Sequence, residues 1–263
     1  MRIVSVNAWG GARYDDLVAW LPTTAADVVC LQEVTRTPDL GGWTRFEDDA
    51  RVLPQRADLM ADVEAALPAY DGWFTVSDSG PVTDDTGAVH RQHFGLGLFA
   101  GPATLVVGAR SAYVHGRYTD HGDAWPHSNR PRAAQVARFE QDGRFVTLGH
   151  LHGLRDDTGK GDSPARRAQA ERLAALVDAM REPGDLVVVC GDLNVLPDSE
   201  TFAVLAGIGL TDLVGTADTR TSSYPKPVRH ASYLLVSDPA AVRDFRVVEA
   251  PEVSDHRPLQ LDV

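Results

Sequence analysis

The amino-acid sequence predicts an α/β fold in which packed mixed or antiparallel sheets carry helices on their outer sides. Strand-like segments outnumber helical ones along the 263 residues, and many follow one another with no helix between them. No glycine-rich segment has the spacing of a phosphate-binding loop, which argues against a doubly wound nucleotide-binding fold. No repeat or long linker interrupts the chain, so we expect one domain over residues 1–263.

In the first third of the chain, hydrophobic periodicity predicts two strands and two helices. The strands are 2–7 (RIVSVN) and the continuous apolar run 26–34 (ADVVCLQEV), which is typical of a strand covered on both faces. Helical spacing is expected over 14–24 and over 56–70, where the second helix stops at its proline. The polar, turn-rich segment 77–89 is expected to be the least ordered part of the chain.

The rest of the chain is richer in strands. Ser163 followed by Pro164 is typical of a helix start, and a short helix over 200–207 is expected with Asp198 or Ser199 as its cap. The remaining apolar or alternating segments predict strands at 93–100, 104–114, 132–140, 144–153, 185–194, 229–238, 242–250 and 257–263.

Composition limits the possible functions and partners. The chain is 43% hydrophobic and 24% charged, with a net charge of −12, so it lacks the broad basic face of a non-specific nucleic-acid binder. The charge says little about a small phosphorylated substrate, because a metal ion can supply positive charge locally. Cys30 and Cys190 lie in apolar runs and are expected to be buried, reduced thiols. With no signal-peptide pattern and no membrane-length apolar run, we expect a cytoplasmic protein with no transmembrane segment.

Polar side chains recur where the predicted strands end. Taken one at a time, each has an ordinary interpretation as a turn residue, a cap or a solvated strand end. The recurrence at five strand ends favours a functional interpretation, because catalytic groups are often held on loops positioned by a rigid sheet. The residues concerned are Asn7, Glu33, His150, His152, Asp192, Asn194, Asp255 and His256.

These residue types suit metal-assisted hydrolysis of a phosphate ester. Oxygen ligands from Asn7, Glu33 and Asp255 suit Mg²⁺ or Mn²⁺, whereas no zinc-like spacing occurs. Asp192 with a neighbouring carboxamide at Asn194 can orient and deprotonate a water, and a histidine can donate to a phosphoryl oxygen. No serine or cysteine stands in a nucleophile elbow, so acyl transfer is disfavoured.

The order of motifs resembles the endonuclease/exonuclease/phosphatase superfamily. The matching pieces are SVN, LQEV, GHLHG, GDLNVLPDS and SDHRPL, spread over nearly the whole chain. The resemblance implies a four-layer α/β sandwich, two mixed β-sheets packed face to face and flanked by helices. It also implies roles: metal ligands at Asn7, Glu33 and Asp255, and catalytic groups at His150, Asp192, Asn194 and His256.

One position departs from the family pattern. Members usually carry an aspartate in the strand that reads here RHASYLLVS, where it orients the catalytic histidine. This chain has Ser232 at that place, and a serine cannot stabilise an imidazolium as a carboxylate does. Either His256 works mainly neutral, or another carboxylate substitutes, or the activity is low.

The substrate is less closely defined than the chemistry. His152, Lys160 and Arg166 lie near the predicted site and are candidates for binding a substrate phosphate, although a solvated loop is the alternative for the last two. The short, acidic chain favours a phosphorylated small molecule or lipid headgroup over nucleic acid. The alternatives are a nuclease acting on DNA or RNA and a catalytically weak binding protein on the same fold. The sequence makes no prediction of the oligomeric state.

Overall fold

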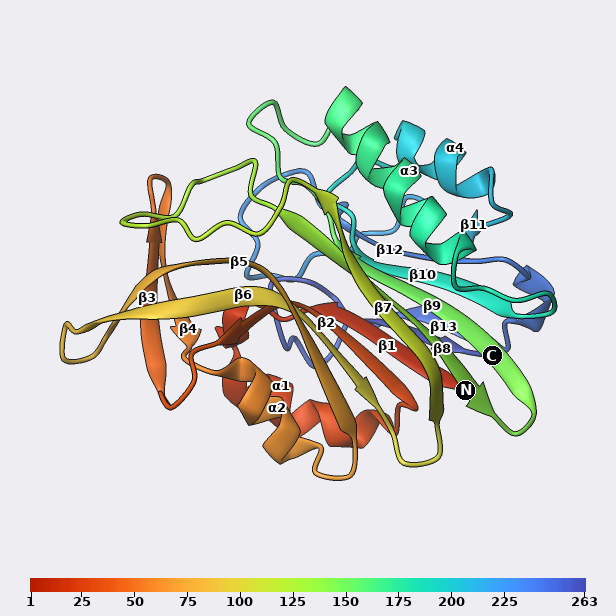
Figure 1. Cartoon of the computed structure of the whole chain (residues 1–263), viewed down its shortest axis with the longest axis horizontal. Coiled ribbons are helices and arrows are strands. Elements are labelled where there is room, and N and C mark those ends of the chain that lie inside the picture. Colours follow the sequence, from red (N-terminus) through yellow and green to blue (C-terminus); the bar gives the residue numbers. More distant parts are fainter.

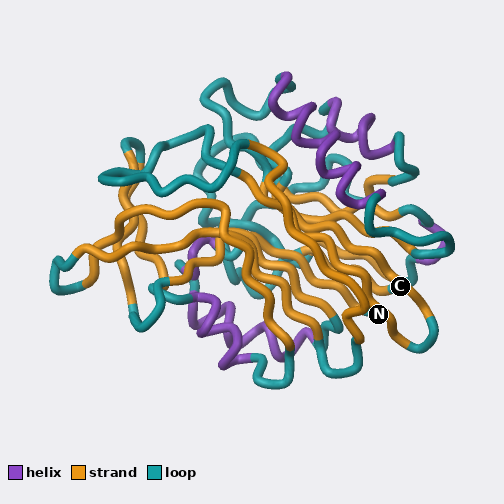
Figure 2. The backbone as a smooth tube through the Cα atoms, in the orientation of Figure 1, coloured by secondary structure: helices purple, strands orange, loops and turns teal.

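Two mixed β-sheets packed face to face form the centre of the molecule, and helices cover the outer face of each (Figure 1). The computed structural model describes residues 1–263. The layers run helix, sheet, sheet, helix, and the backbone trace shows the two strand layers stacked between them (Figure 2). The four-layer α/β sandwich with two mixed sheets is therefore confirmed.

The larger sheet has eight strands, of which only β1 and β2 are parallel neighbours. In spatial order its strands are β13 (Asp244–Val247), β14 (Leu259–Asp262), β1 (Arg2–Asn7), β2 (Val28–Arg36), β6 (Val89–Ala100), β5 (Asp71–Asp84), β3 (Trp43–Asp48) and β4 (Arg51–Arg56).

The smaller sheet has six strands, with β9 and β10 as its parallel pair. Its strands in spatial order are β11 (Thr211–Asp212), β12 (Ser232–Val236), β10 (Leu186–Asp192), β9 (Arg144–His152), β8 (Arg132–Gln141) and β7 (Leu105–His115). Because β1–β2 and β9–β10 run parallel within their sheets, each pair delivers two strand ends to one edge.

Helices pack on each sheet through apolar side chains. The larger sheet carries α1 (Tyr14–Trp20) and α2 (Leu59–Ala66), whose Leu17 and Val63 join Leu31 of β2 in one buried cluster. The smaller sheet carries α3 (Pro164–Asp178) and α4 (Glu200–Ala206). The remaining short 3₁₀ turns are η1 (Trp9–Gly11), η2 (Leu21–Thr24) and η3 (Pro239–Ala241).

The predicted helix starts agree closely with the structure. The Ser163 side chain accepts from the backbone N–H of Arg166, and the Ser199 side chain accepts from that of Thr201, so both cap assignments are confirmed. The helix expected from residue 56 begins only at Leu59, because Asp58 is its cap and the preceding residues belong to β4. Cys30 and Cys190 are buried free thiols, as expected.

In the first third of the chain one expectation was wrong and one hairpin was not predicted. The segment 77–89 is not poorly ordered: β5 runs through it to Asp84 and β6 leaves it at Val89, forming a hairpin. The Asp84 carboxylate accepts from the backbone of Thr86 and Ala88, so the polar residues build the turn. The sequence analysis also missed β3 and β4, a hairpin at the sheet edge where Pro54 is tolerated.

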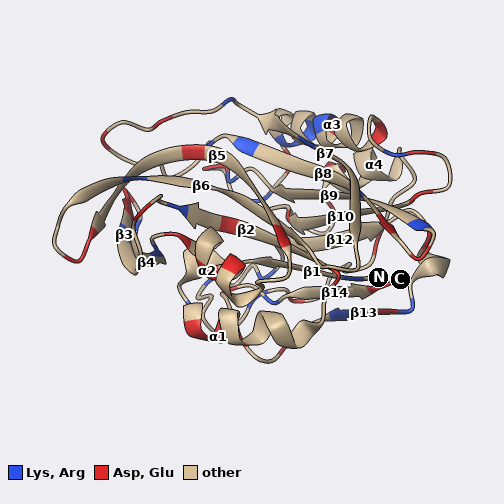
Figure 3. Ribbon diagram, turned by 60° about the horizontal axis from the view of Figure 1, so that its bottom comes forward, with Lys and Arg blue, Asp and Glu red and all other residues tan.

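The charged groups do not gather on one broad face. In the view of Figure 3, basic and acidic residues are interspersed over both sheets and the loops. None of the helices has the length and apolarity needed to cross a bilayer.

Candidate active site

A cavity of about 840 Å³ opens at the edge where the ends of β1, β9 and β10 meet. We call it the strand-end cavity. It is basic in an acidic chain, because its lining includes eight of the 25 lysines and arginines but only five of the 37 acidic residues. The eight cations are Arg51, Arg130, Arg132, Arg155, Lys160, Arg166, Arg220 and Lys226, and the five acids are Glu33, Asp156, Asp157, Asp192 and Asp255.

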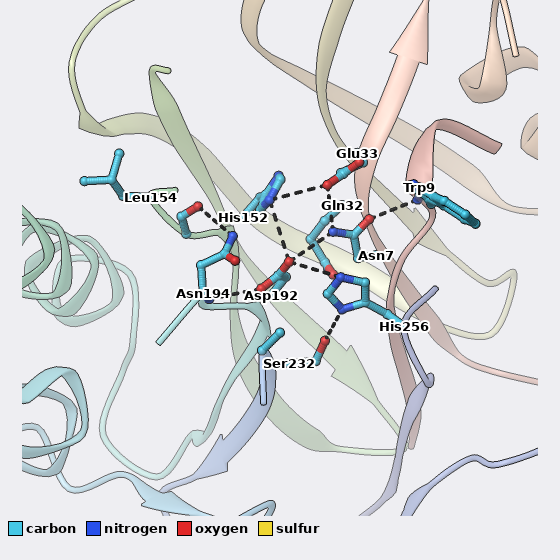
Figure 4. Close-up of polar contacts among 12 residues, drawn as sticks. Asn7, Trp9, Gln32, Glu33, His152, Leu154, Asp192, Asn194, Ser232 and His256 are labelled. Atoms are coloured by element: carbon cyan, nitrogen blue, oxygen red, sulfur yellow. Dashed lines mark hydrogen bonds and ion pairs between the residues drawn. The ribbon is translucent and has the colours of Figure 1, made fainter. Parts of the chain in front are cut away.

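Asn7 joins the two sheets at the floor of this cavity. It ends β1, is fully buried, and its Nδ2 donates to Glu33 Oε1 at 3.0 Å and to Asp192 Oδ2 at 3.1 Å (Figure 4). Its Oδ1 accepts from the backbone N–H of Trp9 at 2.9 Å, which fixes the side chain in a local turn. One carboxamide therefore holds a carboxylate from each sheet.

Glu33 does not end its strand as the sequence suggested. β2 continues to Arg36, and the pairing with β6 shifts between Gln32 and Val34, so Glu33 is the extra residue of a β-bulge. Its φ is 55°, a left-handed conformation that is rare for this residue type. Bulges re-aim side chains and concentrate near functional sites, and this one turns the carboxylate out of the sheet into the cavity.

Asp192 is the last residue of β10 and is 2% exposed. Its Oδ1 accepts from the backbone N–H of Asn194 at 3.0 Å, while the Asn194 Nδ2 donates to the Gly153 carbonyl at 3.3 Å. The tips of β9 and β10 approach so closely that a Cβ on Gly153 would lie 2.1 Å from the Leu193 carbonyl oxygen. Burial raises the pKa of the Asp192 carboxyl, which makes it a better base than an exposed aspartate.

His256 and Ser232 are in direct contact. The ring Nδ1 lies 2.9 Å from Ser232 Oγ, and Nε2 lies 3.4 Å from Asp192 Oδ2 (Figure 4). The structure thus places Ser232 where the orienting aspartate was expected. Burial, and next the nearby Arg220 guanidinium, hold the pKa of His256 well below its usual range, so the ring is neutral near pH 7.

Of the two histidines of β9, only His152 reaches the cavity. Its Nε2 lies 3.7 Å from both Glu33 Oε1 and Asp192 Oδ2. Burial, and next the neighbouring Arg132, lower the pKa of His152 well below its ordinary value. The sequence predicted a catalytic role for His150 and a substrate-binding role for His152, whereas the structure places His152 in the cavity and His150 outside it.

His150 lies between the sheets, away from the cavity. Its Nε2 lies 2.7 Å from Gln32 Nε2 and therefore accepts, so its Nδ1–H donates to Gln135 Oε1 at 3.1 Å. Gln135 in turn donates to Thr75 Oγ1 at 3.0 Å. We call this group the inter-sheet polar cluster, and its members are Ser5, Gln32, Thr75, Gln135 and His150. Full burial lowers the pKa of His150 to about 3, so it remains an uncharged linker.

Asp255 forms an ion pair that the sequence analysis did not identify. Its Oδ2 accepts from Arg220 Nη1 at 2.8 Å, and the Arg220 guanidinium also stacks on Tyr224 at 4.0 Å from the ring centroid. Burial raises the pKa of the Asp255 carboxyl to about 7. No sequence signal pointed to Arg220, which lies in an irregular segment and reaches the site only because Thr219–Thr221 pairs with Asp255–Arg257.

Lys160 and Arg166 both line the cavity but are placed differently. Lys160 Nζ donates to the His230 carbonyl, and burial lowers the pKa of Lys160 to about 8. Arg166 donates its guanidinium to the carbonyls of Leu154, Gly159 and Gly161, so it holds the loop that carries Lys160. The structure therefore gives Arg166 a loop-binding contact, and of these two residues it is Lys160 whose charge lies close to Asp192 and Asp255.

The polar groups of the cavity fit a hard divalent ion held by few protein ligands. No three His, Cys, Asp or Glu side chains converge tightly enough to cage a metal. Glu33 supplies a carboxylate oxygen, and Asp255 is already paired with Arg220. Asn7 turns its Nδ2 to Glu33 and its Oδ1 to the Trp9 N–H, so its oxygen would reach an ion beside Glu33 only after the carboxamide turns over. Mg²⁺ commonly keeps several waters and binds through one or two carboxylates plus substrate phosphate. The few oxygen ligands of this cavity are consistent with that kind of coordination.

Sequence comparison assigns the chain to a class of hydrolases that act on phosphate esters. Within that class it belongs to the endonuclease/exonuclease/phosphatase family, whose model matches residues 4–256. Among curated proteins, no sequence matches the chain.

Solved structures from several organisms confirm the fold. A mannosyl-6-phosphatase from Bacteroides thetaiotaomicron is 16% identical with a TM-score of 0.68, covering 100% of this chain and 98% of the other. A family member from Bacteroides vulgatus is 18% identical with a TM-score of 0.67, covering 99% and 97%. D. rerio TDP2 complexed with single-strand DNA product is 16% identical with a TM-score of 0.64, covering 99% and 97%.

Proposed function

We propose that the protein is a Mg²⁺- or Mn²⁺-dependent hydrolase of a compact phosphate ester, such as a phosphorylated small molecule or lipid headgroup. The observation that carries the proposal is the meeting of Glu33, Asp192 and His256 from three separate segments within one cation-lined cavity. Buried acids and imidazoles that share a cavity are costly to hold together, and their retention is expected where they do chemistry.

The metal would be held by Glu33 and, once its carboxamide turns over, by Asn7 Oδ1, with Asp255 close by. When bound, it would neutralise phosphate charge and stabilise the leaving oxygen. The remaining groups of the site belong to the chain itself, and their contacts indicate which proton or oxygen each one handles.

Asp192 is the base that orients and deprotonates the attacking water. Its Oδ1 is held by the Asn194 backbone N–H, while its Oδ2 faces His152, His256 and Asn7. Burial raises its pKa, which strengthens it as a proton acceptor. Asn194 therefore acts through Asp192, as the carboxamide partner that the sequence suggested.

The two cavity histidines are the donors to the phosphoryl oxygens. His152 and His256 flank Asp192 Oδ2 at 3.7 Å and 3.4 Å, so a phosphate beside the attacking water lies within reach of both rings. Lys160 adds a positive charge on the same side as Asp255 and binds the phosphate electrostatically.

The basic lining favours a small anionic substrate over extended nucleic acid. The excess of cations is confined to the cavity, whereas the whole chain has a net charge of −12. Long nucleic acid is usually gripped by many phosphate contacts along an open basic surface. The similarity in fold to TDP2 keeps a nuclease as the second candidate.

One hydrolysis panel tests the proposal. The substrates are p-nitrophenyl phosphate, bis-(p-nitrophenyl) phosphate and supercoiled plasmid, each with Mg²⁺, with Mn²⁺ and with excess chelator. We expect release of p-nitrophenol with either metal, none in chelator, and no plasmid nicking. Nicking without small-ester turnover would favour the nuclease, and full turnover in chelator would refute metal dependence.

A further inference from the structure

Four arginines are buried in this protein, and one of them lacks the partners that the others have. Arg130 pairs with Asp78 through two hydrogen bonds of 2.6 and 2.8 Å, and Arg220 pairs with Asp255. Arg166 donates to three backbone carbonyls. Arg132, which is 4% exposed, donates only its Nε to the Gly153 carbonyl at 2.9 Å and forms no ion pair with any residue.

An unpaired buried guanidinium is expensive. Burial, and next the adjacent Arg130, lower the pKa of Arg132 to about 10, which shows how unfavourable its charge is at this place. Its neighbouring carboxylate, Asp78, is already occupied by Arg130 and His121. Arg132 lines the strand-end cavity, and its two terminal nitrogens form no hydrogen bond with another residue.

A second cation without a carboxylate stands beside it. Arg155 lines the same cavity, forms no ion pair, and donates one Nη2 hydrogen to His127 Nε2 at 3.2 Å. The two segments that carry these arginines are fastened together, since Asn129 N donates to the Arg155 carbonyl at 3.0 Å and Arg132 Nε donates to Gly153. The pair is therefore a fixed feature of one cavity wall.

This wall lies next to the groups assigned to the reacting phosphate but forms no hydrogen bond or ion pair with them. Asp192 contacts both Asn7 and His256, and none of these three residues forms a hydrogen bond or ion pair with Arg132 or Arg155. Arg132 donates to the backbone of Gly153, next to His152, and its charge is close enough to lower the pKa of that histidine. A substrate bound at the centre would extend along this wall with whatever group lies beyond its reacting phosphate.

We propose that Arg132, with Arg155 beside it, forms an anion subsite that binds a second negatively charged group of the substrate, so that the preferred substrate is a small phosphate ester with two anionic groups. The planar guanidinium of Arg132 offers two terminal nitrogens for bidentate recognition of a phosphate or carboxylate. This inference rests on the proposed phosphoesterase function and narrows its substrate class.

The decisive comparison uses substrates that differ by one phosphate. Phosphate release is measured with Mg²⁺ from fructose 6-phosphate and fructose 1,6-bisphosphate, for the wild type and for Arg132→Gln. We expect the variant to lose about 30-fold in kcat/KM on the bisphosphate, the scale of a charge-assisted bidentate contact, and less than about threefold on the monophosphate. Arg155→Gln should act in the same direction with a smaller loss.

The outcomes separate the possible roles of Arg132. Equal losses on both substrates would mean that Arg132 contacts the reacting phosphate, and no loss on either would mean that it binds no substrate; both would overturn the subsite. Arg132→Lys keeps the positive charge but loses the two-pronged guanidinium, so it should retain part of the preference for the bisphosphate. The exposed Arg110→Gln on β7 is the matched control and should change neither substrate.

A binding measurement distinguishes failure of the subsite from failure of the proposed function. In excess chelator, inorganic phosphate should raise the melting temperature of the wild type, and the rise should be largely lost in Arg132→Gln. If no ester is hydrolysed but this difference is seen, the phosphoesterase function is wrong and the anion site stands. If hydrolysis occurs but phosphate stabilises both proteins equally, the function stands and the subsite is wrong.

Discussion

The inter-sheet polar cluster and the strand-end cavity start from the same strands and use similar residues, yet they do different work. β9 contributes His150 to the first and His152 to the second, and β2 contributes Gln32 to the first and Glu33 to the second. In the cluster, the His150 ring is neutral and both of its nitrogens are hydrogen-bonded. In the cavity, carboxylates and rings lie 3.4 to 3.9 Å apart around space that a substrate can enter.

The difference shows that burial and polarity alone do not identify a functional group. Both histidines of β9 are fully desolvated, and burial is the largest cause of the lowered pKa of each. The two histidines differ in the charge of their neighbours. His152 lies near carboxylates and arginines, whereas His150 contacts two uncharged amides. Backbone strain also marks the cavity as the functional site, because Glu33 and Asn194 both have a φ of 55° there.

The largest expected loss of activity comes from a substitution at the end of β10 that reaches the cavity. Asp192→Asn keeps the shape of the side chain but removes its charge, so activity should fall by about 100-fold or more, the usual scale for loss of a general base. The melting temperature should change little or rise, because burial disfavours this charge. The measurements are steady-state kinetics and thermal unfolding.

Asp185→Asn at the opposite end of β10 is the matched control. Asp185 pairs with Arg138 through contacts of 2.8 and 2.9 Å, and the side-chain hydrogen bond of Arg138 lowers its pKa to about 2. This variant should lose stability and keep its activity. If Asp192→Asn destabilised the protein as much as Asp185→Asn, Asp192 would be a structural turn residue.

The next effect separates the two histidines of β9 directly. His152→Asn should lower kcat by about 100-fold with little change in stability, because it removes a donor to the phosphate. His150→Asn should leave activity within about threefold but destabilise the fold by about 1 to 3 kcal/mol, because Gln32 and Gln135 lose their shared partner. Kinetics and urea unfolding of both variants test this, and a large activity loss in His150→Asn alone would restore the assignment made from the sequence.

The sequence identified most of the parts of this site but not their exact neighbours. Asn7 and Asp192 end strands of the two different sheets, and His256 precedes β14, which runs antiparallel to β1, so all three lie at one edge of the sandwich. The sequence could not choose between His150 and His152, since both project from the same face of β9. The choice depends on where the sheets separate at their edge, which is a tertiary property.

Other features of the site gave no local signal, among them the bulge at Glu33, a residue that the sequence had marked as a strand end. Glu33 lies within an apolar strand, and its exposure to the cavity depends on a bulge whose register is set by β6. Arg132 begins β8 as an ordinary charged strand end, and its lack of a partner is visible only once Asp78 is seen to belong to Arg130. The β3–β4 hairpin was missed because its polar, proline-containing strands lie at a sheet edge, where hydrophobic periodicity is weak.

A smaller effect is the pH dependence of stability from His150. Its pKa is about 3 in the folded protein and about 6.5 when unfolded, so the unfolded state binds more protons between these values. Stability should therefore be lost as the pH falls from about 6.5 towards 3, by about 1.4 kcal/mol per pH unit for this group. Urea unfolding from pH 4 to 7 should show a shallower slope in His150→Asn, and an unchanged slope would mean that His150 is protonated in the fold.

The smallest effect, on the shape of the pH–rate profile, concerns Ser232. Its Oγ lies 2.9 Å from His256 Nδ1, and the pKa of His256 is held well below its usual range by burial and Arg220. A carboxylate at that place would favour the imidazolium, because an opposite charge raises a histidine pKa far more than a hydroxyl does. We expect the protonated ring to be the better donor to a phosphoryl oxygen, so Ser232→Asp should extend activity to higher pH. Ser232→Asn, which has the same size without the charge, should keep the wild-type profile. Should the aspartate and asparagine variants give the same profile, charge behind His256 does not govern its role, and His256 acts as a neutral donor.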